Sequence, residues 1–126
     1  MAKPKVIAVI DDVPFVLRAV GNLLAALGFK TETYPSAEAF LAAVATSTAT
    51  CLLVDIDLGA TDGFALAHRL AADGYDIPII FMTGRDDAAI WKRAVRAGGV
   101  ALLRKPFLAG MLMEALGKAA REGDRG

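Results

Sequence analysis

The sequence has few of the features that would place it in several large classes of protein. Its single cysteine, Cys51, cannot form a disulfide within the chain, which favours a reducing, cytoplasmic setting. Neither sign of charge is in excess, because 14 Lys and Arg balance 14 Asp and Glu, so charge gives no case for nucleic-acid binding. No apolar run approaches the roughly 20 residues of a membrane span. The five apolar residues between Lys5 and Asp11 are too few for a signal peptide.

The chain does have enough apolar residues for one substantial core. Its 126 residues match the usual size of a single domain, and a hydrophobic fraction of 56% is too high for a disordered chain. We expect one domain over residues 1–121, followed by a frayed tail over residues 122–126.

Apolar runs alternate along the chain with segments of helical periodicity. Four runs are almost wholly apolar, as in parallel strands covered on both faces, whereas residues 29–34 alternate with polar residues, as in an edge strand. This alternation predicts an α/β fold of the (βα)5, flavodoxin-like type, with strand order 2-1-3-4-5. The expected strands are residues 6–10, 29–34, 51–55, 79–82 and 100–103, and the expected helices are residues 14–27, 36–44, 64–72, 86–97 and 108–121.

Three carboxylates are predicted to meet at one edge of this sheet. Asp11 and Asp12 follow the first strand, and Asp55 ends the third. The predicted strand order places the carboxyl ends of these two strands side by side, where open parallel sheets bind ligands. Carboxylates this close repel one another and need a cation, and hard oxygen ligands suit Mg²⁺, with Mn²⁺ as an alternative.

The same edge is predicted to carry groups suited to phosphoryl chemistry. An aspartyl carboxylate is a competent nucleophile towards phosphoryl groups, so Asp55 can itself become the carrier. Thr83, at the end of the fourth strand, supplies a hydroxyl donor. Lys105, at the end of the fifth, supplies a positive charge that can neutralise the oxygens of the transferred group.

In this order and at these strand ends, the residues resemble the receiver domain of two-component response regulators. The resemblance covers nearly the whole chain and includes the loop length from Asp55 to Gly63. It implies that Asp55 is the phosphoacceptor of a phosphorelay, loaded by a histidine kinase or a phosphotransfer protein. The chain would then be a stoichiometric phosphoacceptor and not an enzyme. The matching motifs are Asp11-Asp12, Asp55, Thr83-Gly84 and Lys105-Pro106-Phe107.

The resemblance also implies roles for the residues around the phosphoacceptor. Thr83 would close onto the phosphate and Lys105 would pair with it, with a cis peptide bond before Pro106. The implied Mg²⁺ ligands are three side chains and one backbone carbonyl, namely Asp11, Asp12, Asp55 and the carbonyl of Asp57.

Two positions depart from the family pattern. Gly59 stands where the family often has proline, which predicts a more mobile loop. Leu102 stands three residues before Lys105, where the family usually has Tyr or Phe. That aromatic normally turns inward as the residue equivalent to Thr83 moves, and it remodels the surface formed here by residues 86–97, 100–103 and 108–121. Leu102 cannot report the change in the same way, so the sequence leaves the coupling to output open.

Several residues have plainer interpretations. Asp11 and Asp12 are also typical of a helix N-terminus, and Asp57 of a solvent-facing acid, although Asp57 could tune hydrolysis of the phosphate together with Arg85. On the last two expected helices, apolar residues exceed one helical stripe. They predict either packing against the sheet or a docking or homodimer face. These residues are Trp91, Met111, Leu112, Met113 and Leu116.

Two rival functions remain open from the sequence. Residues 52–57 also resemble the first motif of haloacid-dehalogenase-type phosphatases, although the acidic pair here precedes the lysine and the chain is short for that fold with its cap. A binding module that ignores phosphate has only Leu102 in its favour. The sequence contains no effector domain after the last expected helix. If the chain is the whole protein, we expect its output to be contact with a downstream protein or a second copy, or the onward passage of phosphate; if it is part of a longer regulator, a further domain sets the output. The sequence does not decide between a stand-alone protein and the receiver of a longer regulator.

Overall fold

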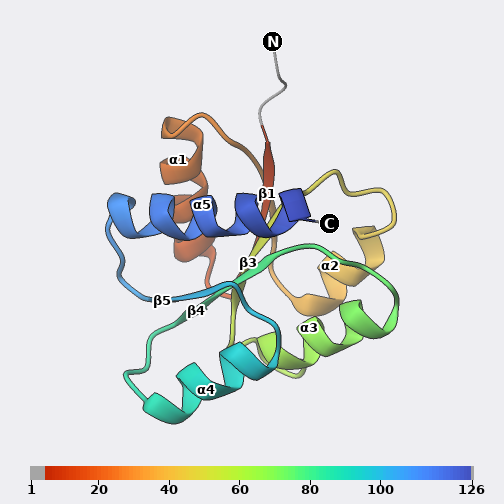
Figure 1. The fold of residues 1–126 in the computed structure, drawn as a ribbon. Helices are drawn as coiled ribbons and strands as arrows, with labels where there is room; N and C mark the ends of the chain where they lie inside the picture. The colour runs from red at the N-terminus through yellow and green to blue at the C-terminus, as the bar shows by residue number, and fades with distance from the viewer. Residues whose placement is uncertain (1–4, 126) are drawn as a thin grey trace.

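The computed structural model describes residues 5–125, and strands and helices alternate through them (Figure 1). Residues 1–4 and 126, which fall in the expected domain and tail, lie outside the described residues. The strands are β1 (Val6–Ile10), β2 (Lys30–Tyr34), β3 (Cys51–Asp55), β4 (Ile79–Thr83) and β5 (Ala101–Arg104). The helices are α1 (Pro14–Ala26), α2 (Ala37–Ala43), α3 (Gly63–Ala72), α4 (Ala88–Arg96) and α5 (Ala109–Arg125).

The five strands form one parallel sheet in the order β2-β1-β3-β4-β5, which confirms the predicted fold. Helices α1 and α5 cover one face of the sheet, and α2, α3 and α4 cover the other (Figure 1). Ile10 at the end of β1 pairs with Val54 on β3. The chain therefore leaves β1 and β3 at the same edge, and the residues that follow these two strands begin side by side.

Strand β3 is buried on both faces, and its side chains alternate between two cores. Leu52 and Val54 join the core beneath α2, α3 and α4. Cys51 and Leu53 join the core beneath α1 and α5. This division follows from the period of two in a strand, and it fixes β3 in the middle of the molecule.

Local signals set most helix ends where the sequence predicted them. Ser36 caps α2, because its Oγ accepts from the backbone N–H of Ala39 at 3.0 Å. Asp87 caps α4 in the same way, by accepting from Ala89. Gly28 follows α1 with φ of 94°, a left-handed conformation that glycine adopts without a steric penalty.

Helix α5 is longer than expected, since it continues to Arg125. The expected frayed tail is thus helical up to that residue. The segment after Arg121 holds no proline, and Gly123 weakens a helix by only roughly 0.5–1 kcal/mol. Within residues 5–125, no helix combines the length and apolar character that crossing a membrane requires.

Candidate phosphoryl and metal site

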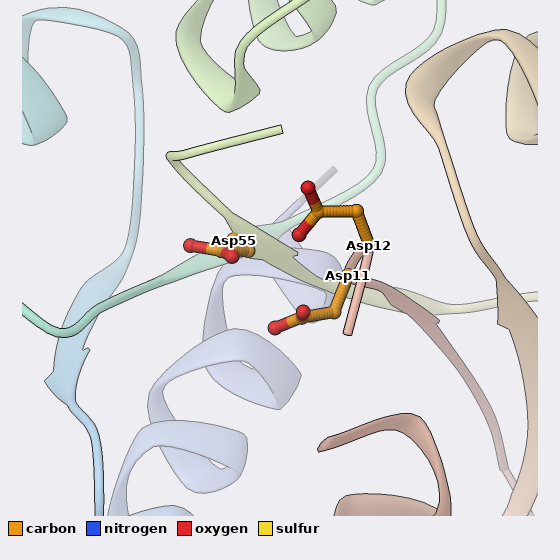
Figure 2. Close-up of side chains that lie close together, drawn as sticks. All are labelled: Asp11, Asp12 and Asp55. Carbon is orange, nitrogen blue, oxygen red and sulfur yellow. The ribbon is translucent and has the colours of Figure 1, made fainter. Parts of the chain in front are cut away.

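The carboxylates of Asp11, Asp12 and Asp55 come together at the carboxyl edge of the sheet (Figure 2). One oxygen from each lies within 4.8 Å of the others. Asp11 is completely buried and Asp55 is 3% exposed, whereas Asp12 is open to solvent. The convergence expected from the strand order is therefore present, and one side of the cluster is accessible.

Backbone amides hold the two buried carboxylates in place. Oδ1 of Asp11 accepts from the N–H of Val13 at 2.9 Å, and Oδ1 of Asp55 accepts from the N–H of Asp57 at 3.1 Å. Val13 itself is the N-cap residue of α1 and makes no side-chain cap. The interpretation of Asp11 and Asp12 as an ordinary helix cap thus accounts only for the hydrogen bond that Asp11 accepts from Val13. It gives Asp12 no role.

Lys105 bridges the two buried carboxylates. Its Nζ lies 3.1 Å from Oδ2 of Asp11 and 3.3 Å from Oδ2 of Asp55. The peptide bond between Lys105 and Pro106 is cis, as the resemblance implied. Because this lysine lies 94 residues from Asp11 and 50 from Asp55 in sequence, only the fold brings the three groups together.

The electrostatics show that one lysine does not fully balance the acids. Burial raises the pKa of Asp55 and the charge of Asp11 raises it further, while the Asp57 amide and Lys105 act in the opposite direction. Burial alone would lower the pKa of Lys105, but Asp11 and Asp55 outweigh it and leave that pKa raised. Even with Lys105 present, ionisation of Asp55 stays disfavoured within this cluster of three carboxylates. Such a cluster is suited to an additional hard cation such as Mg²⁺.

Thr83 lies at the end of β4, which pairs with β3 on one side and β5 on the other. It is 2% exposed, and its Oγ1 accepts from the N–H of Arg85 at 3.0 Å. The backbone N–H of Lys105 donates to the carbonyl of Thr83 at 2.7 Å. This short bond couples the position of Lys105 to that of the threonine.

Asp57 lies at the exposed rim, as the sequence indicated, but it is not free. Its Oδ1 pairs with Nη2 of Arg85 at 2.7 Å, and both side chains are about half exposed. The ion pair joins the loop after β3 to the loop after β4. The sequence indicates this pair only weakly, because no periodic pattern relates the positions of charged residues in two separate loops.

Leu102, the departure from the family pattern, lies half-buried on β5 opposite Phe81 of β4. It packs against the core beneath α2, α3 and α4. The structure places no aromatic side chain at this position, so movement there cannot take the form of a ring turning inward.

A contact that the sequence did not reveal is the packing of Gly63 beneath the end of strand β3. A Cβ at Gly63 would lie 2.6 Å from the backbone oxygen of Asp55 and 2.9 Å from Cα of Ile56. The N–H of Gly63 also donates to the carbonyl of Ile56 at 3.1 Å. Helix α3 therefore begins directly against the backbone that carries Asp55, and only glycine leaves room for it.

We expect Gly63→Ala to destabilise the fold by roughly 1–3 kcal/mol, because backbone atoms must move to admit the methyl group. Gly110→Ala is the matched control, since a Cβ there meets nothing within 4 Å and its φ is ordinary. Urea unfolding of both variants measures the difference. Equal stability of Gly63→Ala and the parent protein would show that the helix can shift without cost.

The apolar residues of the last two helices divide between core and surface. Leu112 and Leu116 are buried, whereas Trp91, Met111 and Met113 are each about half exposed. Packing in the core is thus confirmed for Leu112 and Leu116, whereas the interpretation of the exposed residues as a docking or homodimer face stays a prediction. His68 lies exposed on α3, and Cys51 lies buried with its pKa raised by burial to about 12.

Comparison with known proteins gives one consistent result. The model of the response regulator receiver domain matches residues 7–117. The response regulator protein TodT of Pseudomonas putida is 33% identical over 119 residues, which cover 94% of this chain and 52% of TodT. The transcriptional regulatory protein FixJ of Bradyrhizobium diazoefficiens is 31% identical over 118 residues, covering 94% of this chain and 58% of FixJ. The chain spans about half the length of the curated relatives it matches.

Solved structures agree with these relatives. A response regulator receiver protein from Burkholderia phymatum has a TM-score of 0.79 at 32% identity, covering 89% of this chain and 91% of that one. A CheY-like receiver domain protein from Methanospirillum hungatei has a TM-score of 0.86 at 23% identity, and the match covers 98% of this chain and 99% of that one. At this identity the similarity supports the fold alone. The chain thus belongs to the family of response regulator receiver domains of two-component systems.

Proposed function

We propose that this chain accepts a phosphoryl group on Asp55 from the phosphohistidine of a histidine kinase or of a phosphotransfer protein. Receiver domains of response regulators take phosphoryl groups from histidine kinases, and they generally bind Mg²⁺. The observation that carries the proposal for this chain is the bridge from Lys105 to Asp11 and Asp55 beside the open carboxylate of Asp12.

The transfer replaces one bond to phosphorus by another. An oxygen of the Asp55 carboxylate attacks, an O–P bond forms, the N–P bond of the donor breaks, and the imidazole leaves with the electron pair. The carboxylate must be ionised to attack. Asp11, Asp12 and Asp55, with the backbone carbonyl of Asp57, would hold Mg²⁺, whose positive charge stabilises the phosphoryl oxygens.

Two further residues would act on the phosphorylated form. Lys105 already lies 3.3 Å from Asp55 and can pair with a phosphoryl oxygen without a large movement. The hydroxyl of Thr83 is buried at the end of the neighbouring strand and can donate to another. The signal would pass from Thr83 to the surface of α4, β5 and α5. Because Leu102 replaces the usual aromatic, we infer that this change involves α4 and its preceding loop more than a side-chain rotation on β5.

The partner that reads this surface would be a downstream protein or a second copy of the chain. Trp91 of α4 and Met111 of α5 expose apolar area suited to either. Sedimentation with and without a phosphate mimic distinguishes them, since only self-association changes the mass with concentration.

Incubation with acetyl phosphate and Mg²⁺ tests the proposed function without a cognate kinase. We expect intact-protein mass spectrometry to show the addition of one phosphate per chain, and none when Mg²⁺ is removed by a chelator. A protein that gains no phosphate would contradict the proposal. Repeated turnover of a phosphomonoester would instead favour the haloacid-dehalogenase-type phosphatase.

We also expect the ion pair between Asp57 and Arg85 to set the lifetime of the phosphoprotein. Asp57 follows Asp55 by two residues, and its carboxylate is exposed to solvent. It can therefore accept a proton from a water molecule that attacks the phosphoryl group on Asp55. Arg85 holds that carboxylate at 2.7 Å. Asp57→Ala should therefore lengthen the lifetime severalfold, and Arg85→Gln should shorten it.

Loss of the phosphate is followed by mass spectrometry after removal of acetyl phosphate. Arg69→Gln is a suitable control, because it breaks an exposed ion pair of similar length on α3. Identical lifetimes in the parent and both loop variants would show that the pair plays no part in hydrolysis.

A further inference from the structure

A cavity lies at the opposite end of the sheet from the carboxylates. It has a volume of about 540 Å³, within the range of about 300–1,000 Å³ typical of small-molecule sites. Residues beside the starts of β1 and β3 line one side, and the later turns of α5, which cross β1 in Figure 1, line the other. Cys51 in its wall lies four residues before Asp55, about 13 Å along the strand at the usual rise.

The cavity exists because small residues of α5 face it. Gly117 and Ala120 line it where larger side chains would fill it. A Cβ at Gly117 would meet only Nη1 of Arg121, at 3.6 Å, which is ordinary contact. No close approach requires glycine at this position, although glycine weakens a helix interior. The cavity is therefore open because this sequence has small residues on that face of α5, and not because a close backbone contact excludes larger ones.

The lining combines an apolar wall with positive charge. Phe29, Cys51 and Met113 contribute apolar surface to the lining, which also includes Lys5. Arg121 lies beside Gly117. Among the residues that the structure describes, no acidic side chain lines the cavity. Within residues 5–125, neither Lys5 nor Arg121 makes an ion pair with a described acid.

We propose that this cavity binds a small amphipathic carboxylate, whose apolar tail enters between β1, β3 and α5 while its carboxylate pairs with Lys5 and Arg121. The ligand class follows from the two features together. An apolar wall favours an alkyl chain. Lys5 in the lining and Arg121 beside Gly117 pair with no acid among the described residues, and these two cations favour a negative head group. The phosphoacceptor edge is not involved, so the site is independent of the chemistry at Asp55.

Titration of ¹⁵N-labelled protein with decanoate, followed by NMR, tests the proposal. We expect saturable shifts of the amides of Phe29, Cys51 and Gly117, with much smaller shifts at the carboxylate edge. Decanol and decyltrimethylammonium carry the same tail without the negative charge, and both should bind more weakly than decanoate. Equal binding of the three compounds, shifts scattered over the surface, or no saturation at millimolar decanoate would each overturn the proposal.

Two variants test the two halves of the site. Gly117→Leu fills the cavity and should weaken decanoate binding at least tenfold, whereas Gly110→Leu on the same helix, which also has open space, should not. Lys5→Gln should weaken binding roughly three- to fivefold, as expected for one exposed charge, while Lys92→Gln on α4 should not. Thermal unfolding verifies that each variant is folded. An unchanged affinity in Gly117→Leu would show that decanoate binds elsewhere.

Discussion

Asp55→Asn should abolish phosphate uptake from acetyl phosphate, with a loss of at least a hundredfold in labelled protein. An amide oxygen is a poor nucleophile and cannot form the acyl phosphate bond. The other described acids at this edge are each engaged in another way. Asp12 is exposed and is a proposed ligand of Mg²⁺. Asp11 is completely buried and bound to Val13 and Lys105, and Asp57 is held by Arg85. Intact-protein mass spectrometry measures the effect.

The loss should not arise from unfolding. Burial raises the pKa of Asp55, so the folded state disfavours its ionised form, and at neutral pH this carboxylate costs stability that would be recovered only as the pH falls through its pKa. Removing the charge should leave the unfolding temperature unchanged or higher. Asp57→Asn is the matched control and should retain the label. Phosphate that persists in Asp55→Asn would place the acceptor elsewhere.

Lys105→Met should destabilise the protein by about 3 kcal/mol at neutral pH in the absence of divalent ions. The lysine is 22% exposed and is the positive charge paired with both Asp11 and Asp55. Removing one partner of a largely buried ion pair leaves the other charges without compensation, which typically costs about 3–5 kcal/mol. We take the lower end because Asp12 leaves one side of the cluster open to solvent. Urea unfolding in the presence of a chelator measures the change.

Arg104→Met is the control for Lys105→Met, since Arg104 is adjacent in sequence and its 3.5 Å pair with Asp86 is exposed. It should change stability by less than about 0.5 kcal/mol. Added Mg²⁺ should restore more stability to Lys105→Met than to the parent, because the ion then has no ammonium competing for the same oxygens. If Lys105→Met is as stable as the parent protein without Mg²⁺, charge compensation of Asp11 and Asp55 by this lysine does not contribute to stability.

The fold could be predicted from the sequence because the composition of each strand shows whether it is buried on both faces or lies at an edge of the sheet. Residues 6–10 and 51–54 are apolar and belong to central strands, whereas residues 30–34 are mixed and form β2, which lies at an edge. The strand order then brought Asp11 and Asp55 to one edge without any knowledge of distances. The predicted boundaries differ from the observed ones at β5, which was expected over residues 100–103, and at α5, which was expected over residues 108–121. The residues at these ends have only weak preferences for a strand or a helix.

Contacts between separate loops have no comparable signal in the sequence, and the only link predicted there between Asp57 and Arg85 is a shared role in hydrolysis. The pair of Asp57 and Arg85 joins residues 28 positions apart in loops that have no periodic pattern. Gly63 is one of 12 glycines, and nothing in its neighbours shows that the Asp55 backbone lies against it. The cavity beside Gly117 depends on how far α5 extends along β1 and β3, and this distance is a property of the packed helix.

The alternation of β3 between two cores limits how the molecule can respond to a modification at the end of that strand. Sliding the strand by one residue would exchange the environments of Leu52 and Leu53 and disrupt packing on both faces at once. New charge at Asp55 must therefore be accommodated by the segments beyond the strand ends. Residues 84–89, between β4 and the first turn of α4, are all exposed, so a change in their conformation need not disturb the packing of either core. A partner that senses the charge state of this protein should read the position of α4.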